Sequence, residues 1–319
     1  MEKCLIFNTD KDYVRTKNFI KYTKEIFEHK VINSKSRAGK IISLFKSRGC
    51  WAYVPNLDPI LAVMSKIARV NLISDILEPY PEMQAGILKR AFYSLLERIS
   101  IKNSHLTIAV TKEEEENLGE KYNIKNIMTV RNFPDLDDFK PCKGKFSNFS
   151  IVYFGLYALS RDLTNATKAI KELQKKYAID FHVIGDEKLL GQTLCRYKYH
   201  GWLNHEKSSE IIGRCHLGIS PYENNEHCNL TLQNKAFQYA ACNVVPLSTD
   251  LKPLKKYKKI VKLADNTAEG WKKNIEKAYF SWLRGRTRFN QREELIQRKW
   301  NAENEWQKLK HFICKFTQF

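Results

Sequence analysis

The sequence predicts an α/β protein with two parallel sheets, one in each of two domains. Short apolar runs alternate with segments of helix length along the chain, which is typical of βα units. A stretch rich in Pro, Asp, Lys and Gly, residues 132–149, separates the runs into two series. The length of 319 residues also favours two domains over one.

The first series of apolar runs predicts five strands of an N-terminal sheet. Each run is bounded by polar or turn residues and followed by a segment long enough for a helix. The runs are Cys4–Phe7, Cys50–Val54, Val70–Ile73, Leu106–Val110 and Ile127–Val130.

The second series predicts a C-terminal sheet of the same kind. Its runs are Ile151–Phe154, Phe181–Ile184, Leu217–Ser220, Val244–Leu247 and Ile260–Leu263, with a further short strand in Tyr199–Leu203.

The boundaries follow from the polar stretch and from the tail. We expect an N-terminal domain over 1–140 and a C-terminal domain over 141–285. From about Ala268 the pattern becomes helical, with Trp300 and Trp306 among its large apolar residues. We expect the segment 286–319 to pack back on the N-terminal domain.

The charge is strongly positive. Lys and Arg number 54 against 35 Asp and Glu, which gives a net charge of +19 and an isoelectric point near 9.5. Such a surface attracts nucleic acid, phosphorylated ligands or acidic lipid headgroups. No zinc-finger, RNP or basic-zipper pattern is present, so nucleic acid is the least favoured of the three.

The eight cysteines contain no CxxC pair and lie mostly in apolar stretches, which disfavours a disulfide framework or a metal site. The apolar run near the N-terminus is too short for a signal peptide. Charged residues interrupt the longest apolar region, Pro59 to Leu77. We therefore expect a cytoplasmic protein that does not cross a membrane.

The first strand of the second series ends in a pattern suited to phosphate. Gly155 follows the strand directly, and Arg161 precedes the next helix. A glycine lets a ligand approach the backbone, and an arginine beside a helix N-terminus binds a phosphate. An ordinary βα loop with a solvated arginine explains the pattern equally well.

Two further glycines repeat this pattern. Gly185 and Asp186 follow the strand Phe181–Ile184, at the strand end where open α/β sheets bind ligands. Gly201 and Trp202 follow Tyr199, and the aromatic ring suits a flat base. For Gly185 and Asp186 a simple turn is the alternative, and this pattern by itself favours the turn.

The stretch LQNKAFQYAACNVVPLS predicts a helix with an anion-binding N-terminus. Asn234 and Lys235 begin the helix, where an amide, an ammonium and free backbone N–H groups converge. The small residues Ala240, Ala241 and Cys242 permit close packing on a sheet, and Asn243 tolerates the left-handed conformation that ends helices. The alternative is an amphipathic helix with a solvated lysine.

Taken together, six segments resemble retaining GT-B glycosyltransferases of the glycosyltransferase family 4 type. They are VRNFPDLDDFKP, IVYFGLYALSRDL, DFHVIGD, YHGWLNHEKSSEII, HLGISPY and NKAFQYAACNVVPLS, and they span most of residues 125–265. The resemblance implies two Rossmann-like domains with a cleft between them. It also implies that the C-terminal domain binds the diphosphate and ribose of a nucleotide-sugar.

Carried over by position, the resemblance makes Arg161 and Lys235 the cations that bind the diphosphate. It also implies that Gly155, which has no side chain, leaves the loop after the first strand open to the diphosphate. Position 238, which binds the ribose hydroxyls as a glutamate in the family, is Gln238 here, and Leu230 stands where the family has a second glutamate. The donor-binding set that we predict is Gly155, Gly185, Asp186, Gly201, Trp202, Asn234 and Gln238.

In the N-terminal half, NLISDILEPYPEM is similar to the family's Asp-x-His-Glu segment. Asp75 and Glu78 are present, but Leu77 replaces the histidine. The resemblance makes Glu78 a catalytic residue on the acceptor side, together with Arg161 and Lys235 on the donor side. A turn at the end of a strand is the alternative for Asp75 and Glu78.

The sequence thus predicts a retaining glycosyltransferase with a nucleotide-sugar donor and a glycan or lipid-linked acceptor, acting in polysaccharide or lipopolysaccharide synthesis. It predicts no cofactor and no metal, and an anionic membrane surface as a further partner. A GT-B module that binds nucleotide or glycan without turnover is one alternative, because Gln238, Leu230 and Leu77 replace family residues. A nucleic-acid-binding protein is the other, on charge alone.

Overall fold

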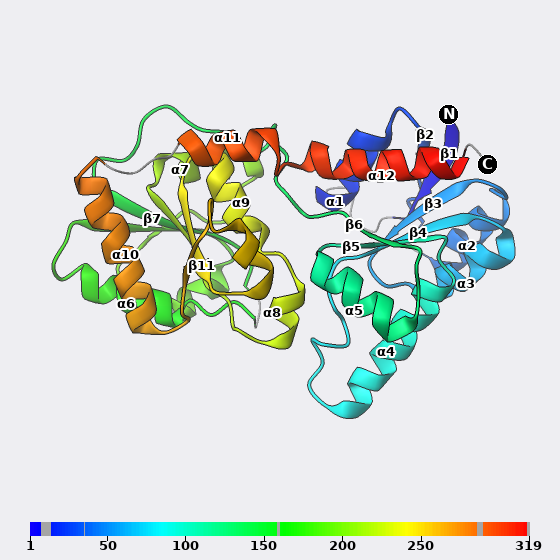
Figure 1. Cartoon of the computed structure of the whole chain (residues 1–319), viewed down its shortest axis with the longest axis horizontal. Coiled ribbons are helices and arrows are strands. Elements are labelled where there is room, and N and C mark those ends of the chain that lie inside the picture. The colour runs from blue at the N-terminus through cyan, green and yellow to red at the C-terminus, as the bar shows by residue number, and fades with distance from the viewer. Residues whose placement is uncertain (8–13, 35, 158–159, 286–289, 318–319) are drawn as a thin grey trace. The chain divides into compact units, whose positions relative to one another are not determined.

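The chain forms two compact units, each built on a parallel sheet as the sequence predicts, and each sheet has six strands (Figure 1). The computed structural model describes residues 1–7, 14–34, 36–157, 160–285 and 290–317. Unit 1 consists of Met1–Asn132 and Ala302–Phe319, and unit 2 of Phe133–Asn301.

Unit 1 alternates strands and helices along its first part. Its sheet has the order β2-β1-β3-β4-β5-β6, with all neighbours parallel. The elements are β1 (Glu2–Ile6), α1 (Val14–Thr23), β2 (Phe27–Val31), α2 (Arg37–Phe45), β3 (Trp51–Pro55), α3 (Pro59–Ala68), β4 (Asn71–Ile76), α4 (Ile87–Lys102), β5 (Leu106–Ala109), α5 (Lys112–Tyr122), β6 (Ile127–Thr129) and, from the end of the chain, α12 (Ala302–Thr317).

The strand β2 has no counterpart among the predicted runs. Its sequence is FEHKV, and only Phe27 in it is buried, because it lies at the edge of the sheet. An edge strand with one apolar anchor lacks the continuous apolar run by which the central strands are recognised.

Unit 2 has the sheet order β12-β11-β10-β7-β8-β9, again all parallel. This is a doubly wound order. The strands β8 and β9 follow on one side of β7, and β10, β11 and β12 follow on its other side, so the order of strands reverses between β7 and β10. The elements are β7 (Phe149–Gly155), α6 (Thr164–Leu173), β8 (Ile179–Gly185), η1 (Glu187–Gln192), β9 (Lys198–Tyr199), α7 (His205–Arg214), β10 (Leu217–Ser220), α8 (Glu226–Leu230), α9 (Asn234–Ala241), β11 (Val245–Thr249), η2 (Lys252–Tyr257), β12 (Lys262–Ala264), α10 (Ala268–Leu283) and α11 (Asn290–Arg298).

Both domain boundaries differ from those expected. Phe133 and Phe139 are buried in the core of unit 2, with the ring of Phe133 4.8 Å from that of Phe237, so unit 2 begins before residue 141. Ile296 of α11 is buried in the same core, so the return to unit 1 begins at Ala302 rather than at residue 286. Aromatic residues within the polar stretch decide the first boundary, since their burial outweighs its overall polarity.

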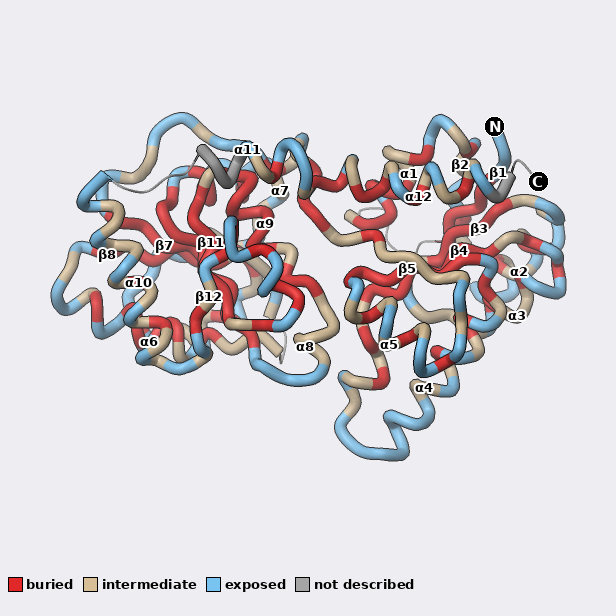
Figure 2. The backbone as a smooth tube through the Cα atoms, viewed as in Figure 1, coloured by how far each residue is buried: buried red, intermediate tan, exposed pale blue. Residues whose placement is uncertain are grey.

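The core of each unit lies on both faces of its sheet, and the strands are the most deeply buried part of the backbone (Figure 2). In unit 1 the helix α12 covers one face, where Trp306 contacts Phe19 edge-on with 5.8 Å between ring centres. Phe19 in turn stacks on Tyr53 at 4.0 Å.

A buried ion pair joins helix α1 to the sheet of unit 1. Asp75 on β4 accepts hydrogen bonds from Arg15 Nε at 2.8 Å, Arg15 Nη2 at 3.0 Å and Tyr53 OH at 2.6 Å. The guanidinium of Arg15 lies 4.8 Å from the ring centre of Trp306. Arg15 and Asp75 are 2% and 0% exposed, so Asp75 is a structural residue of the fold.

We predict that Asp75→Ala lowers the free energy of unfolding of unit 1 by about 3–5 kcal/mol, because it leaves a buried guanidinium without its carboxylate. Urea unfolding followed by circular dichroism measures the change. The exposed pair of Lys175 and Glu172 supplies the control, since Glu172→Ala should leave the unfolding midpoint unchanged. An Asp75→Ala protein as stable as the original would show that the ion pair does not hold the layers together.

Candidate functional site

The candidate site lies in unit 2, where β7 and β10 diverge in the doubly wound sheet. Ligands of such sheets bind at the carboxyl ends of the strands beside this reversal. Gly155 ends β7, and Tyr222 follows the end of β10. Arg161 follows β7 along the chain, and Lys235 comes from the first turn of α9.

Two glycines allow an unusually close approach of backbone and side chain at this edge. Gly155 and Gly185 are register partners at the ends of β7 and β8, with φ angles of +148° and +131°. A Cβ atom on Gly185 would lie 2.0 Å from the carbonyl oxygen of Gly155. A Cβ atom on Gly155 would lie 2.2 Å from Cε of Lys235. Both positions therefore require glycine, and the side chain of Lys235 lies directly across Gly155.

Lys235 is held among aromatic rings with its ammonium at the strand ends. The residue is 5% exposed, and its Nζ donates a hydrogen bond to Tyr222 OH at 3.3 Å. The same Nζ lies 5.6 Å from the ring centre of Tyr222 and 5.8 Å from that of Tyr153. The aromatic faces favour a cation at this point.

Arg161 reaches the same tyrosine from the other side of the loop. Its Nη1 donates to the carbonyl oxygen of Leu156 at 2.7 Å, and its Cζ lies 5.9 Å from the ring centre of Tyr222. The structure thus brings the two predicted cations to one aromatic ring. Burial is the main cause that raises the pKa of the Tyr153 hydroxyl, and the positive charge of Arg161 opposes this rise.

The helix α9 begins and ends as the sequence predicts. It runs from Asn234 to Ala241, and Asn243 takes the left-handed φ of +57° before β11. The ring of Tyr239 packs directly on Gly218 of β10. A Cβ atom on Gly218 would lie only 2.3 Å from Cγ of Tyr239. The hydroxyl of Tyr239 accepts from Phe154 N at 3.0 Å and donates to the carbonyl oxygen of Ile219 at 3.1 Å. These contacts fix α9 against the ends of β7 and β10.

The N-terminal turn of α9 presents polar groups that no described residue satisfies. Within the described ranges no side chain caps α9, and the side chains of Asn234 and Gln238 form no hydrogen bond. Gln238 is 8% exposed and, three residues after Lys235, shares its face of the helix. Gln233, at the N-cap position, donates through Nε2 to the carbonyl oxygen of Cys228, while its buried Oε1 accepts from none of the described groups.

The second glycine loop is arranged for the fold as much as for a ligand. The amide of Gly185 donates to the carbonyl oxygen of Gly201 at 2.9 Å, and Gly201 has a φ of +70°. One carboxylate oxygen of Asp186 caps η1 by accepting from Lys188 N at 3.0 Å. Trp202 is 66% exposed, which leaves its ring face open to a planar group.

Three tyrosines in and beside the site were not predicted from the sequence. Tyr222 and Tyr153 surround Lys235, and Tyr199 OH donates to the carbonyl oxygen of Gly185 at 2.9 Å. Their positions in or just after apolar runs are those of ordinary core residues. The one available signal is that Tyr222 follows a strand of the parallel sheet, at its ligand-binding edge.

The predicted acceptor-side residues lie in unit 1. Leu77 and Glu78 follow β4, with Leu77 buried and Glu78 half-buried. Glu78 belongs to an acidic group with Glu97 and Glu114, whose side chains are both fully buried. Burial is the first cause that raises the pKa of Glu114, and the charges of Glu97, Glu78 and Asp75 raise it further. Whether Glu78 acts with Arg161 and Lys235 stays a prediction.

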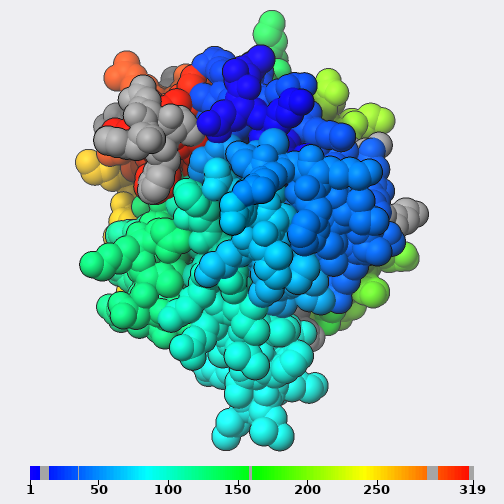
Figure 3. Space-filling view, turned by 90° about the vertical axis from the view of Figure 1, so that its right-hand side faces the viewer, coloured from blue at the N-terminus to red at the C-terminus, as the bar shows by residue number. Residues whose placement is uncertain are grey.

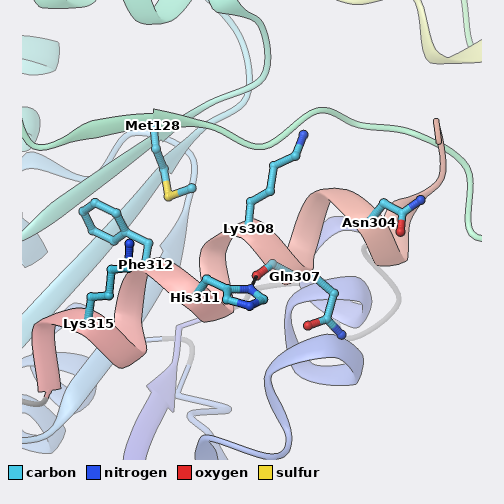
Figure 4. Close-up of a pocket in the computed structure, with 7 residues that line it drawn as sticks. All are labelled: Met128, Asn304, Gln307, Lys308, His311, Phe312 and Lys315. Carbon is cyan, nitrogen blue, oxygen red and sulfur yellow. Dashed lines mark hydrogen bonds between the residues drawn. The ribbon is translucent and has the colours of Figure 1, made fainter.

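A groove of about 450 Å³ in unit 1 is lined by Met128 of β6 and by one face of α12 (Figure 4). Its polar groups do not converge. Lys308 pairs with Glu305 within α12, and His311 Nδ1 lies 2.8 Å from the carbonyl oxygen of Gln307.

Across the described part of the chain, no cluster of three or more His, Cys, Asp or Glu residues could hold a metal ion. None of the described helices is long and apolar enough to cross a membrane.

Comparison with known proteins identifies the fold. No protein-family model matches the sequence, and no curated protein does. Among solved structures, sucrose-phosphate synthase from Thermosynechococcus elongatus matches with a TM-score of 0.78 at 10% identity, over 100% of both chains. Anabaena HepE in complex with UDP and glucose matches with a TM-score of 0.72 at 10% identity, over 99% of this chain and 100% of its own. The lipopolysaccharide outer core galactosyltransferase WaaB matches with a TM-score of 0.66 at 10% identity, over 100% of both chains.

These likenesses extend over nearly the whole chain, and they agree with the two doubly wound parallel sheets seen in units 1 and 2. The predicted fold class is confirmed: the protein has the GT-B fold, with two Rossmann-like domains.

We predict that Glu114→Gln makes unit 1 more stable at pH 8 than the original protein. The folded-state pKa of Glu114 is raised above its ordinary value of 4.5, so its protonated form contributes stability below pH 4.5 that is lost as the pH rises through the folded-state pKa. Glutamine keeps an acceptor for Val110 N, which donates to Glu114 Oε2 at 3.2 Å. Unfolding free energies measured from pH 5 to pH 8 test this.

Glu116 on the same helix is exposed, so Glu116→Gln is the matched control and should leave the pH profile unchanged. If Glu114→Gln and the original protein lose stability in parallel as the pH rises, the buried carboxyl is not the titrating group.

Proposed function

We propose that the protein is a retaining glycosyltransferase that moves a sugar from a nucleotide-sugar to a glycan or lipid-linked acceptor. The observation that carries the proposal is the convergence of Lys235 and Arg161 on Tyr222, beside the strand ends of Gly155 and Gly185. Two cations and the N-terminus of a helix at the reversal point of a doubly wound sheet suit a diphosphate.

The structural neighbours support a nucleotide-sugar as the donor. The titles of three of them name UDP with glucose, UDP-glucose, and UDP with GlcNAc as bound molecules. A uridine nucleotide is therefore the first donor to test. The nucleotide-sugar is a substrate, and the proposed reaction needs no cofactor or metal.

In the proposed reaction, the bond between the anomeric carbon and the diphosphate oxygen breaks, and the acceptor oxygen bonds to the same face of that carbon. The diphosphate departs with the electron pair of the broken bond and so develops additional negative charge, and one of its oxygens takes up the proton that the acceptor hydroxyl releases. Lys235, Arg161 and the N–H groups of α9 are already in place before that charge develops, and contacts of this kind each lower a barrier by about 3–4 kcal/mol.

The other predicted residues complete the donor site in this proposal. Gln238 binds the ribose hydroxyls, Asn234 adds an amide at the start of α9, and the ring of Trp202 stacks on the base. The unsatisfied Oε1 of Gln233 accepts a hydrogen bond from a hydroxyl of the transferred sugar. Glu78 acts on the acceptor side in unit 1.

The net charge of +19 supports an anionic membrane surface as the place of action. A cytoplasmic enzyme that binds such a surface peripherally would meet lipid-linked acceptors there, as polysaccharide or lipopolysaccharide synthesis requires. WaaB, one of the structural neighbours, is itself described as a lipopolysaccharide outer core galactosyltransferase.

We predict that Lys235→Met weakens UDP binding and lowers kcat/KM for the UDP-sugar roughly 100-fold, because it removes one fixed charge from the diphosphate. Methionine retains most of the apolar stem that packs on Gly155. Uridine has no diphosphate, so its affinity should be the same for both proteins. Calorimetric titration with UDP and with uridine separates the two effects.

Lys207 is an exposed lysine on α7 of the same unit, and Lys207→Met is the control, with unchanged affinity for both ligands expected. Equal losses for UDP and uridine in Lys235→Met would mean that the lysine only shapes the pocket, which contradicts the proposed role. Tight UDP binding with no donor hydrolysis or transfer in the original protein would favour the binding module without turnover.

We predict that Gln238→Glu keeps the fold and preserves or raises UDP affinity, since a carboxylate accepts charge-assisted hydrogen bonds from both ribose hydroxyls. Gln238→Ala should bind UDP more weakly and bind 2′-deoxy-UDP as well as it binds UDP. Titration of both nucleotides with all three proteins measures this. Loss of binding in a folded Gln238→Glu protein would show that Gln238 does not contact the ribose.

A further inference from the structure

The N-terminal half of α4 in unit 1 is apolar and almost fully exposed. Ile87 and Leu88 are each 87% exposed, Phe92 is 57% exposed and Leu95 is 53% exposed. Figure 2 shows this part of the backbone in the colour of exposed residues, and in Figure 3 the cyan segment that contains α4 projects from the body of unit 1. Single exposed apolar residues are common, but a contiguous group of this kind marks an interaction surface.

The projection follows from how α4 is anchored. Its C-terminal half is held in unit 1 by the buried residues Glu97, Ser100 and Ile101. Its N-terminus begins at Gly86, which has a φ of +99° and provides no side-chain cap. The anchored half fixes the direction of the helix, so its first two turns extend beyond the core.

Cations continue the apolar stripe along the helix. Leu88, Phe92 and Leu95 follow helical spacing, and Arg98 and Lys102 are the next two positions of the same stripe. From Phe92 to Arg98 the helix rises about 9 Å. This stripe is therefore apolar in the first turns of α4 and cationic about 9 Å further along the helix, and Lys89 and Arg90 are exposed beside its apolar part.

The charge of α4 on its outer side is wholly positive. The only carboxylate in the helix, Glu97, is buried, where it accepts from Tyr122 OH at 2.6 Å and Lys121 Nζ at 3.3 Å. Lys89, Arg98 and Lys102 form no ion pair with any described residue. A groove of about 520 Å³ between α4 and α5 is lined by Leu95, Arg98, Lys102 and Lys121, among others.

We propose that this surface, Ile87 to Lys102 of α4, docks unit 1 onto an anionic lipid bilayer. The apolar tip enters the boundary between headgroups and acyl chains, which a short amphipathic helix reaches to about 5–10 Å, and Arg98 and Lys102 bind lipid phosphates from above it. A second copy of the chain would bring two sets of unpaired cations together, which disfavours pairing of two α4 helices.

The topology connects this surface to the proposed reaction. In a parallel βα unit the helix that follows a strand begins at the carboxyl end of the sheet. The exposed start of α4 therefore lies at the same edge of the unit 1 sheet as Leu77 and Glu78, which follow β4. For its role in delivering a lipid-linked acceptor, the inference rests on the proposed function, whereas binding to a bilayer does not.

The test is cosedimentation of the full chain with two kinds of vesicle. One kind contains phosphatidylcholine alone, and the other contains about 30% phosphatidylglycerol as well. The original protein should bind the anionic vesicles and bind the neutral ones at least tenfold more weakly. Leu88→Ser/Phe92→Ser should reduce binding to anionic vesicles at least tenfold. Both substituted residues are exposed, so the fold should be preserved.

The matched control lies on α10 of unit 2, where Phe280→Ser/Leu283→Ser changes the same two residue types at partly exposed positions and should leave vesicle binding unchanged. For the charges, Arg98→Gln/Lys102→Gln should weaken binding to anionic vesicles roughly 25-fold, since each cation near such a surface contributes about fivefold. Lys273→Gln/Lys277→Gln on α10 removes the same net charge and should have a much smaller effect.

Equal losses in the α4 and α10 variants would overturn the proposal, because binding would then depend on net charge alone. So would sedimentation equilibrium that shows a dimer in the original protein and a monomer in Leu88→Ser/Phe92→Ser, since a second copy would then cover the helix. UDP affinity measured on the same proteins separates the two proposals. If a variant loses vesicle binding but keeps its UDP affinity, the result bears on the α4 surface alone. If a variant keeps vesicle binding but loses UDP affinity, the result bears on the proposed donor site alone.

Discussion

The close approach of α9 to the sheet of unit 2 is the constraint on which the candidate site depends. Gly218 has no side chain, so the ring of Tyr239 can lie against β10, and the Tyr239 hydroxyl bridges the ends of β7 and β10. With α9 held at this distance, the side chain of Lys235 can only cross the strand end at Gly155. Any side chain at position 218 or 155 would displace the helix or the lysine.

This arrangement places two cations beside one aromatic ring. Lys235 is surrounded by the rings of Tyr153 and Tyr222 and by a glycine backbone, and Arg161 approaches the same ring of Tyr222. The faces of these rings favour a cation at this point. The preorganisation of the site is therefore a consequence of packing, and the same contacts that fix α9 fix the position of the charge.

The sequence predicts much of the fold because buried strands of parallel sheets are nearly continuous apolar runs. It does not reveal β2, whose edge position leaves one apolar anchor, or the burial of Phe133, Phe139 and Ile296 in unit 2.

For the site, glycine, lysine and arginine are recognisable because few core positions tolerate them. Tyr222 is not, since a tyrosine beside a strand looks like a core residue until the opposing lysine is placed. Asp75 is the converse case: its place in a family-like motif suggests chemistry, but both its oxygens are bound by Arg15 and Tyr53.

The two units differ in the charged side chains near the ends of their strands. At the strand ends of unit 2, the charged groups that converge are Lys235 and Arg161, and the N-terminus of α9 adds further positive potential. In unit 1 the strand β4 is followed by Glu78, which interacts with the buried Glu114, as does the buried Glu97. Carboxyl groups at that edge suit a hydroxyl group, which can donate a hydrogen bond to a carboxyl oxygen. Both sheets are parallel and have six strands, so in the proposed reaction it is the side chains at the strand ends, and not the fold, that would divide the work between an anionic donor and a neutral acceptor.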